Sequence, residues 1–568
     1  MMLDASELPA GKTLTADLCI VGGGAAGITL ALQLIDSGLE VLVLESGGLR
    51  PEEATQALYS GSVEDERLHS PPDRYRQRRF GGTSTIWGGR CMPFDPIDFE
   101  PREYMPHSGW PLGREELLPY YRRANRLAEA GEFEYQADAR WRPMIRDFDS
   151  PHFTADTLER FSCPTDFGAR YGHKLTAARN VTVVLHANVV RIQLAPEGER
   201  VESLEVRTLN GRTLTARARQ FVIATGGLEN ARLLLASRDV HAQGIGNSND
   251  LLGRFYMCHL AGTIGAITIN KPLQDVYHGY EVDDEGIYCR QRLALRESVQ
   301  REQGIGNFIA RLHHPRITDP AHRNSILSLL YLAKPIIPYE YGKRLHGGVK
   351  SDFPTWLKHV RNVATAPLDA FKFATHMVRD RFLAERKFPS IIMRSRANLF
   401  SLDFHAEQQP NALSRVTLAE RLDPLGMPQL HVDWRYTVID VDTVKRSLAL
   451  LAQDLSRSGV GRFEYDPDSV EEEVTRYGAY GGHHIGTVRM GFNERDSVVD
   501  ANGRLHGVHN LFVAGSATFP TSSQANPTLT VIAMALRLAQ HLTGLLRRPA
   551  PATLTASEEN ELLESKAS

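Results

Sequence analysis

Near the N-terminus, short apolar runs alternate with an amphipathic stretch, and this pattern predicts a β-α-β unit. Residues 17–21 form an apolar run that is typical of a buried parallel strand, and apolar residues then recur at helical spacing over 28–34. A second apolar run, 41–44, ends in Glu45. Three glycines stand between the first strand and the helix. The pattern therefore predicts strand, glycine-rich turn, helix and second strand within about thirty residues.

This unit has the pattern of a dinucleotide-binding motif. Gly22 permits the tight turn, Gly24 lets the backbone approach a pyrophosphate, and Gly27 lets the helix pack closely on the strand. We expect the diphosphate at the helix N-terminus, where unpaired N–H groups and the helix dipole favour an anion. Glu45 is placed to accept hydrogen bonds from a ribose diol. The alternative is a glycine turn that serves packing alone. The residues expected to bind the cofactor here are Gly22, Gly24, Ala25, Ala26, Gly27, Glu45 and Ser46.

A second glycine-rich segment, 79–90, is too rich in glycine for a helix or a central strand. We expect a loop whose backbone approaches a flat group such as an isoalloxazine ring, and the alternative is an irregular surface turn. Residues 220–227 form another strand that ends in glycines, which would return the chain to the nucleotide-binding domain and make that domain discontinuous. The cofactor-binding residues expected in these parts are Gly82, Thr83, Ser84, Trp87, Gly88, Gly89, Val190 and Gly226.

The C-terminal part carries the candidate chemistry. His483 and His484 lie in a glycine-rich segment, and Asn526 precedes an apolar helix. Alcohol oxidation removes a hydroxyl proton and a carbinol hydride, and a flavin accepts the hydride. We expect His483 to accept the proton and Asn526 to hydrogen-bond the oxygen. His484 is the rival base, since neighbours in an extended segment face opposite ways. Asn526 before Pro527 is also typical of a helix N-cap. The cofactor residues expected here are Gly515, Ser516, Pro527 and Thr528.

Together these segments resemble the glucose-methanol-choline (GMC) family of FAD-dependent oxidoreductases, which oxidise alcohols and sugars. The resemblance rests on 22–27 with Glu45, and on 81–89, 224–235 and 483–538. The pattern from His483 to Gly491, with 525–530, is similar to the pyranose oxidase and glycoside 3-oxidase branch, which uses a His and Asn pair. The resemblance implies FAD as the cofactor.

One position departs from that branch. Ile86 stands where several pyranose oxidases carry a histidine that is bonded covalently to the flavin. An isoleucine cannot form this bond, so we expect noncovalent FAD.

The expected function is the oxidation of a secondary hydroxyl of a sugar or glycoside to a keto sugar, with hydride going to flavin N5. Oxygen, a quinone or a cytochrome would then reoxidise the flavin. Two alternatives stay open: a polyol or other non-sugar alcohol as the substrate, and a redox-silent FAD-binding protein or lyase.

The expected fold class is α/β. A discontinuous, doubly wound Rossmann-type FAD-binding domain is expected over 15–90, 190–260 and 480–546, and a sheet-based α+β substrate-binding domain over 91–189 and 261–479. Residues 547–568 are rich in Ala, Glu and Ser and are expected to form a disordered tail.

Composition narrows the function classes further. The 568 residues are 42% hydrophobic and 23% charged, as in an ordinary soluble protein, and a net charge of −3 gives no general attraction to nucleic acid. The first residues lack the features of a secretory signal, so cytoplasm is the expected location. The five scattered cysteines indicate neither a disulfide framework nor a metal site.

A basic stretch, 343–396, holds twelve Lys or Arg residues against four acidic residues, with apolar residues at helical spacing. A helix of this kind can contact an anionic membrane surface or an acidic partner. The alternatives are a solvated helix packed on its own domain and the attraction of a phosphorylated or nucleotide-linked sugar.

Overall fold

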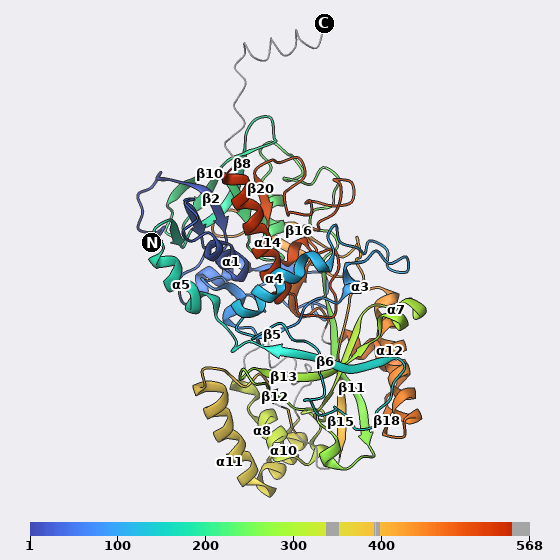
Figure 1. The fold of residues 1–568 in the computed structure, drawn as a ribbon. Coiled ribbons are helices and arrows are strands. Elements are labelled where there is room, and N and C mark those ends of the chain that lie inside the picture. Colours follow the sequence, from blue (N-terminus) through green and yellow to red (C-terminus); the bar gives the residue numbers. More distant parts are fainter. Residues whose placement is uncertain (337–351, 391, 394–397, 477, 548–568) are drawn as a thin grey trace, which may run out of the picture.

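The structure of the chain is a computed structural model that describes residues 1–336, 352–390, 392–393, 398–476 and 478–547. Two units lie one above the other in Figure 1, each built around its own sheet. The basic stretch identified in the sequence is therefore described only in part, and the expected tail lies outside the described residues apart from Arg547.

The upper unit is built on an eight-stranded sheet in the order β1-β7-β3-β2-β10-β9-β8, with β20 paired to β10. Its central pairs are parallel, and β10-β9 and β9-β8 are antiparallel. The predicted apolar runs lie in β2 and β3. The last four residues of β2 and all four of β3 are buried, as is typical of parallel strands that are covered on both faces. The strands are β1 (Met2–Asp4), β2 (Thr13–Val21), β3 (Val41–Leu44), β7 (Val181–Leu185), β8 (Asn188–Leu194), β9 (Val201–Arg207), β10 (Thr213–Ile223) and β20 (Leu511–Val513).

Helices cover this sheet. α14 packs against both α1 and α4, and α5 packs against α1. Among the described residues, α14 is the one helix long and apolar enough to cross a membrane by length and composition, and 61% of its apolar window is buried inside the protein. The helices of this unit are α1 (Ala25–Gln33), α4 (Arg114–Leu127), α5 (Phe167–Ala177), α6 (Glu229–Ala236) and α14 (Thr528–Arg547).

The lower unit is built on a nine-stranded antiparallel sheet in the order β18-β11-β15-β14-β13-β6-β5, with β12 on β13 and β19 on β11. The strands are β5 (Arg90–Cys91), β6 (Phe153–Phe161), β11 (Met257–Ile269), β12 (Glu281–Val282), β13 (Tyr288–Leu295), β14 (Phe308–His313), β15 (Leu399–Ala406), β18 (Gly461–Glu464) and β19 (Tyr480–Ile485).

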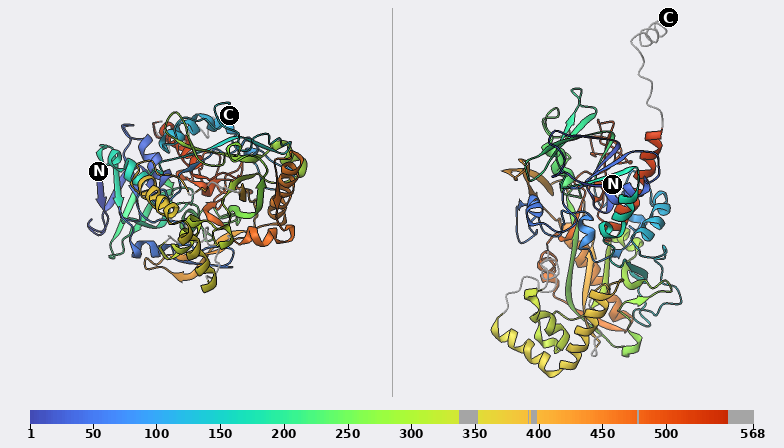
Figure 2. Two further views of the ribbon diagram at one scale, coloured as in Figure 1. Left: turned by 90° about the horizontal axis from the view of Figure 1, so that it is seen from below. Right: turned by 90° about the vertical axis from the view of Figure 1, so that its left-hand side faces the viewer.

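Two groups of helices flank the lower sheet. α12 contacts β14, β15 and β18, whereas α8, α10 and α11 form a separate helical group at the bottom of the molecule in Figures 1 and 2. The helices are α7 (Glu297–Gln303), α8 (Ser325–Leu332), α10 (Phe353–Thr365), α11 (Pro367–His376), α12 (Val438–Arg457) and α13 (Val470–Thr475). A three-stranded sheet and two short helices complete the fold: β4 (Gly61–Val63), β16 (Arg415–Leu422), β17 (Pro428–Asp433), α2 (Glu53–Gln56) and α3 (Pro96–Phe99).

The expected domain boundaries differ from the structure in two places. Segment 91–189 was assigned to the substrate-binding domain, yet β7 pairs parallel to β3 in the upper sheet, and α4 and α5 pack on the helices of that unit. Residues 480–485 were assigned to the FAD-binding domain, yet β19 pairs with β11 of the lower sheet. Both corrections arise from long-range strand pairing, which the apolar pattern of a single strand does not specify.

Candidate active site

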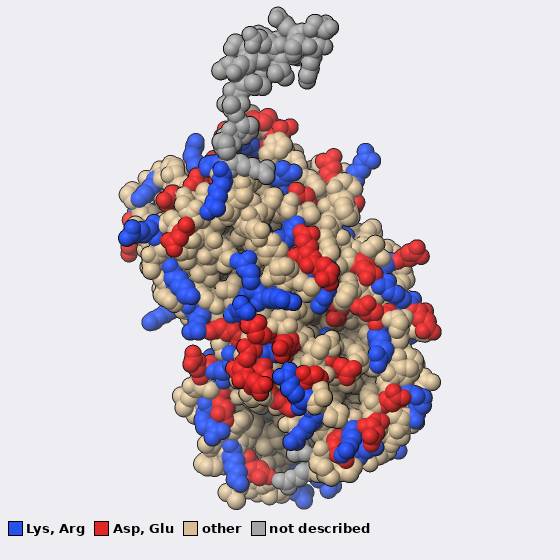
Figure 3. All heavy atoms as spheres, in the orientation of Figure 1, with Lys and Arg blue, Asp and Glu red and all other residues tan. Residues whose placement is uncertain are grey.

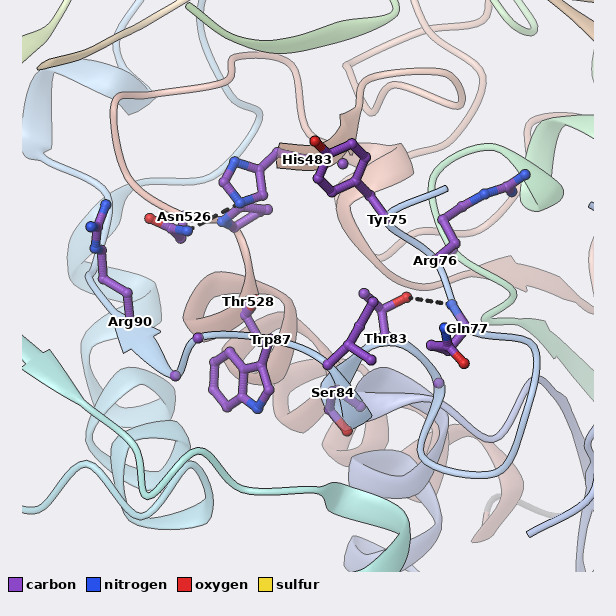
Figure 4. Close-up of a pocket in the computed structure, with 18 of the residues that line it drawn as sticks. Tyr75, Arg76, Gln77, Thr83, Ser84, Trp87, Arg90, His483, Asn526 and Thr528 are labelled. Atoms are coloured by element: carbon purple, nitrogen blue, oxygen red, sulfur yellow. Dashed lines mark hydrogen bonds between the residues drawn. The ribbon is translucent and has the colours of Figure 1, made fainter. Parts of the chain in front are cut away.

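A cavity of about 1010 Å³ is lined by residues of both units, and Figure 4 shows part of it. Nearly all of the site residues expected from the sequence line this one cavity. They are Gly22, Gly24, Ala25, Ala26, Glu45, Ser46, Gly82, Thr83, Ser84, Trp87, Gly88, Gly89, Gly226, His483, His484, Gly515, Ser516, Asn526, Pro527 and Thr528.

Two expected residues lie outside the lining. A Cβ atom on Gly27 would be 1.9 Å from the backbone oxygen of Gly22, so this glycine permits the close approach of α1 to the turn. Val190 is buried in the core, and its neighbour Val189 lines the cavity instead. Successive side chains of a strand face opposite sides, so the Val189 side chain faces the cavity and that of Val190 does not.

Four glycines of the lining have free space where a side chain would be. A Cβ atom added to Gly88, Gly226 or Gly515 would meet nothing within 4 Å, and one added to Gly24 would meet only a backbone atom at 3.9 Å. These glycines keep the cavity wall open. A wall of exposed backbone at the start of α1 suits a diphosphate, so the residues present fit FAD.

Glu45 lies at the carboxyl end of β3 and also lines the cavity. Its carboxylate accepts hydrogen bonds from the backbone N–H groups of Gly23, at 2.7 Å, and Gly47, at 2.8 Å. Burial raises the pKa of Glu45, and the two N–H groups and Arg78 oppose this effect. The carboxylate is thus fixed at the position where the sequence pattern expects a ribose.

His483 and Asn526 lie next to each other in the cavity lining, as Figure 4 shows. The side-chain amide of Asn526 donates to Nε2 of His483 at 3.0 Å. The first turn of α14 is closed by a bond from the N–H of Val531 to the carbonyl oxygen of Pro527. Pro527 therefore occupies the N-cap position that the sequence analysis considered for Asn526, and the Asn526 side chain bonds to the imidazole.

A third residue, His259 on β11, belongs to this group and was missed by the sequence analysis. Nε2 of His259 donates to the carbonyl oxygen of Ser522 at 3.2 Å, since a carbonyl can only accept. Nδ1 of a neutral His259 is then an acceptor, and Nδ1 of His483 donates to it at 2.7 Å. This chain of bonds leaves the lone pair of His483 on Nε2, the nitrogen that faces Asn526.

Burial keeps both imidazoles neutral. It lowers the pKa of His483 well below its usual value, and the nearby His259 and the positive charge of Arg90 act in the same direction. Burial also lowers the pKa of His259 to about 4. Near neutral pH, His483 is therefore an unprotonated base whose Nε2 accepts a hydrogen bond from Asn526 and whose tautomer is fixed by His259.

His484 points to the other side of β19. It is buried against Tyr256, with ring centroids 6.0 Å apart, and against His69, with centroids 6.3 Å apart. Its backbone oxygen accepts a bond from Ser516. This packing agrees with the expectation that His484 forms part of the wall.

Beyond the pair of His483 and Asn526 the cavity has two kinds of lining. Arg90, His405 and Arg316 supply polar groups, and the His405 ring centroid is 6.1 Å from that of His259. The far end, between α8 and α11, is apolar and includes Leu330 and Phe373. The cavity can therefore hold a polar group next to the base and an apolar group farther out.

Comparison with known proteins identifies the family. Residues 17–319 match the family model of FAD dependent oxidoreductases, and residues 410–535 match the model described as GMC oxidoreductase. The chain is 25% identical to 6'''-hydroxyparomomycin C oxidase of Streptomyces lividus, over 93% of this chain and 92% of that protein. It is 31% identical to C-glycoside 3-oxidase of Microbacterium trichothecenolyticum, over 26% of this chain and 27% of that protein.

Solved structures agree with the fold. Pyridoxine 4-oxidase from Mesorbium loti superposes with a TM-score of 0.54 at 20% identity, covering 92% of this chain and 98% of that chain. The predicted α/β fold class, FAD cofactor and family are thereby confirmed. The chain belongs to the FAD dependent oxidoreductases, and its C-terminal part, 410–535, is a GMC oxidoreductase domain.

Proposed function

We propose that this enzyme oxidises a secondary hydroxyl of a sugar or glycoside to a keto group. The observation that carries the proposal is the bond chain from Ser522 through His259 to His483, which leaves a neutral acceptor nitrogen beside the Asn526 amide inside the cavity. The two groups bond to each other at 3.0 Å, and a substrate hydroxyl that enters between them would donate to Nε2 and accept from the amide.

In the proposed reaction, the substrate hydroxyl donates its proton to Nε2 of His483 as the C=O bond forms. The amide of Asn526 donates to the same oxygen and stabilises the negative charge that develops on it. His259 accepts the Nδ1–H of His483 and thereby keeps the receiving lone pair on Nε2. The imidazolium that results keeps both ring protons hydrogen-bonded. FAD, when bound, supplies the acceptor for the hydride that leaves the carbinol carbon.

The polar part of the cavity supports a sugar as the substrate. Arg90, Arg316 and His405 line it together with Thr263 and His313, which offers donors and acceptors for several hydroxyl groups. The names of two relatives bear on the substrate. C-glycoside 3-oxidase of Microbacterium trichothecenolyticum, 31% identical over 26% of this chain, names a ring position, which carries a secondary hydroxyl. Paromamine 6'-oxidase of Streptomyces fradiae, 24% identical over 93% of this chain, names a 6' position, which in a hexose carries a primary hydroxyl. A non-sugar alcohol is the second candidate, because 2-methyl-1,2-propanediol dehydrogenase of Mycolicibacterium austroafricanum is 22% identical over 93% of the chain.

We also propose that FAD is held without a covalent bond. Ile86 lines the cavity in the loop that contains Gly88 and Gly89, and its side chain has no nucleophilic atom. Oxygen, a quinone or a cytochrome would take the electrons from the reduced cofactor. The fructose dehydrogenase large subunit of Gluconobacter japonicus, 25% identical over 94% of the chain, shows by its name that dehydrogenases as well as oxidases occur among the relatives.

The test is a substrate panel read by flavin absorbance without oxygen. Monosaccharides, glycosides and simple alcohols are mixed with the FAD-loaded enzyme, and the product of each reactive compound is analysed for a ketone or an aldehyde. Bleaching by a sugar or glycoside with a ketone product supports the proposal. Bleaching by simple alcohols alone favours the second candidate, and no bleaching by any of them contradicts both.

A further inference from the structure

The helical group at the bottom of Figure 1 has an unusual surface. We call α8, α10, α11 and the following π-helical turn (Met377–Leu383) the helical cap. Seven of the 18 exposed large hydrophobic residues in the described part of the chain lie within 353–383. They are Phe353, Trp356, Leu357, Leu368, Phe371, Val378 and Leu383.

The faces of α10 explain this exposure. His359 is the one buried residue of α10, and its ring is hydrogen-bonded to Ser328 of α8 at 2.9 Å. At about 100° per residue, Phe353, Trp356 and Leu357 fall within an arc of about 100°, and the centre of this arc is about 110° around the helix from His359. The polar contact thus attaches α10 to α8, and the apolar arc faces outward.

α11 repeats the arrangement. Ala370 is its one buried residue, whereas Leu368 is 72% exposed and Phe371 is 70% exposed. Soluble proteins bury such a stripe against their own core. α10 and α11 pack on α8, as the alternative of a solvated helix packed on its own domain expects, but these apolar side chains stay exposed.

Basic residues border the apolar residues. Residues 352–390 contain seven Lys or Arg and four Asp or Glu, a net charge of +3 in a chain whose total is −3. Arg361 lies about 40° beyond the Leu357 edge of the apolar arc of α10, and Lys358 lies farther round on the same side. Lys372 follows Phe371 in α11, and Arg379 of the π-helical turn is paired with Asp380. In Figure 3 the lower left of the molecule, over α11, shows mainly tan and blue atoms. This combination of apolar side chains with a basic border is typical of a helix that lies in a membrane interface.

The active-site cavity extends to the helical cap. Ala374 of α11 and Val378 of the π-helical turn are both exposed and both line the cavity. A surface that covers the helical cap would therefore meet the apolar end of the cavity.

We propose that the helical cap docks on the surface of an anionic phospholipid membrane, with its apolar residues in the interface and its basic residues at the headgroups. A second copy of the chain is the alternative partner for the surface of the helical cap. A twofold contact would bring the same basic border against itself, so like charges would face each other, whereas anionic lipid supplies the opposite charge. Docking would place the cavity mouth at the lipid boundary.

The test is sedimentation of the full-length, FAD-loaded enzyme with vesicles. One set contains phosphatidylcholine alone and the other contains added phosphatidylserine. The enzyme pellets with the anionic vesicles, and salt weakens this binding. The double variant Leu368→Ser with Phe371→Ser lowers the partition coefficient by at least about tenfold, because two interfacial side chains are lost. Phe492→Ser, which removes an 80% exposed phenylalanine elsewhere, is the matched control and leaves it unchanged.

Two charge-reversal substitutions test the electrostatic contribution to membrane binding. Lys358→Glu with Lys372→Glu abolishes the preference for phosphatidylserine, whereas Lys12→Glu, at an exposed site on the upper unit, retains it. Flavin absorbance confirms that each variant is folded. The proposal is overturned if the wild-type enzyme stays in solution with anionic vesicles, or if the serine variant binds as well as the wild type. It is also overturned if these substitutions dissociate a dimer that shows no vesicle binding.

Discussion

The bond from His483 to His259 gives the sharpest prediction about residues that do not touch the substrate. Substituting His259→Leu keeps a side chain of similar size on β11 but removes the acceptor that lies 2.7 Å from Nδ1 of His483. The imidazole must then leave its Nδ1–H without a partner or move the proton to Nε2. In the tautomer with the proton on Nε2, that nitrogen has no lone pair to accept the proton of the substrate hydroxyl.

The expected change in the rate of flavin reduction follows from the free-energy cost of leaving the Nδ1–H of His483 without an acceptor. Leaving a buried donor unsatisfied costs about 1–3 kcal/mol, and about 1.4 kcal/mol corresponds to a factor of ten in rate. The limiting rate of flavin reduction should therefore fall by about fivefold to 150-fold. FAD binding should be retained, because His259 does not line the cavity.

The assay is stopped-flow reduction of the flavin by saturating substrate without oxygen. His259→Asn is the rescue variant, since its amide oxygen can stand near the position of Nδ1 and accept the same bond; it should recover most of the lost rate. His69→Leu removes a comparably buried histidine beside His484 and is the control. An unchanged rate in His259→Leu refutes the positioning role. Equal rates in His259→Asn and His259→Leu also refute it, because a general packing defect would slow both variants alike.

Three further predictions concern the base, the cofactor and the turn. Because burial lowers the pKa of His483, the imidazole stays unprotonated at about pH 6, where an ordinary histidine is mostly protonated, so the reduction rate should be nearly equal at about pH 6 and pH 8. Acid precipitation should release all of the flavin into the supernatant, since Ile86 forms no covalent bond; yellow precipitate would contradict this. Gly24→Val should lower FAD occupancy with little loss of apoprotein thermal stability, because its side chain would enter the cavity. Gly27→Ala should lower the melting temperature itself, since its Cβ would overlap the backbone oxygen of Gly22.

Much of the nucleotide-binding part could be predicted from the sequence because its signals are local. The apolar runs of β2 and β3 are uninterrupted, and the glycines between them have conformational roles that follow from short-range geometry. The cavity accordingly includes Glu45 and the loop that contains Gly88.

Other features depend on contacts between distant parts of the chain. β7 resembles any short apolar strand, and only its pairing with β3 places it in the upper sheet. His259 is a single histidine in a strand, 224 residues from His483, and no spacing or motif marks it. Its role arises from the pairing of β19 with β11, which brings the two imidazoles together.

The central claim is that His483 accepts the hydroxyl proton as the substrate is oxidised. The measurement that tests it most directly is anaerobic flavin bleaching by an active sugar in the wild type and in His483→Ala, with FAD content determined for both. His483→Ala should contain as much FAD as the wild type, and its flavin should be reduced about 10²- to 10⁴-fold more slowly, the range for loss of a general base. Bleaching of His483→Ala at the wild-type rate would contradict it and would assign the base to His484 or to another residue.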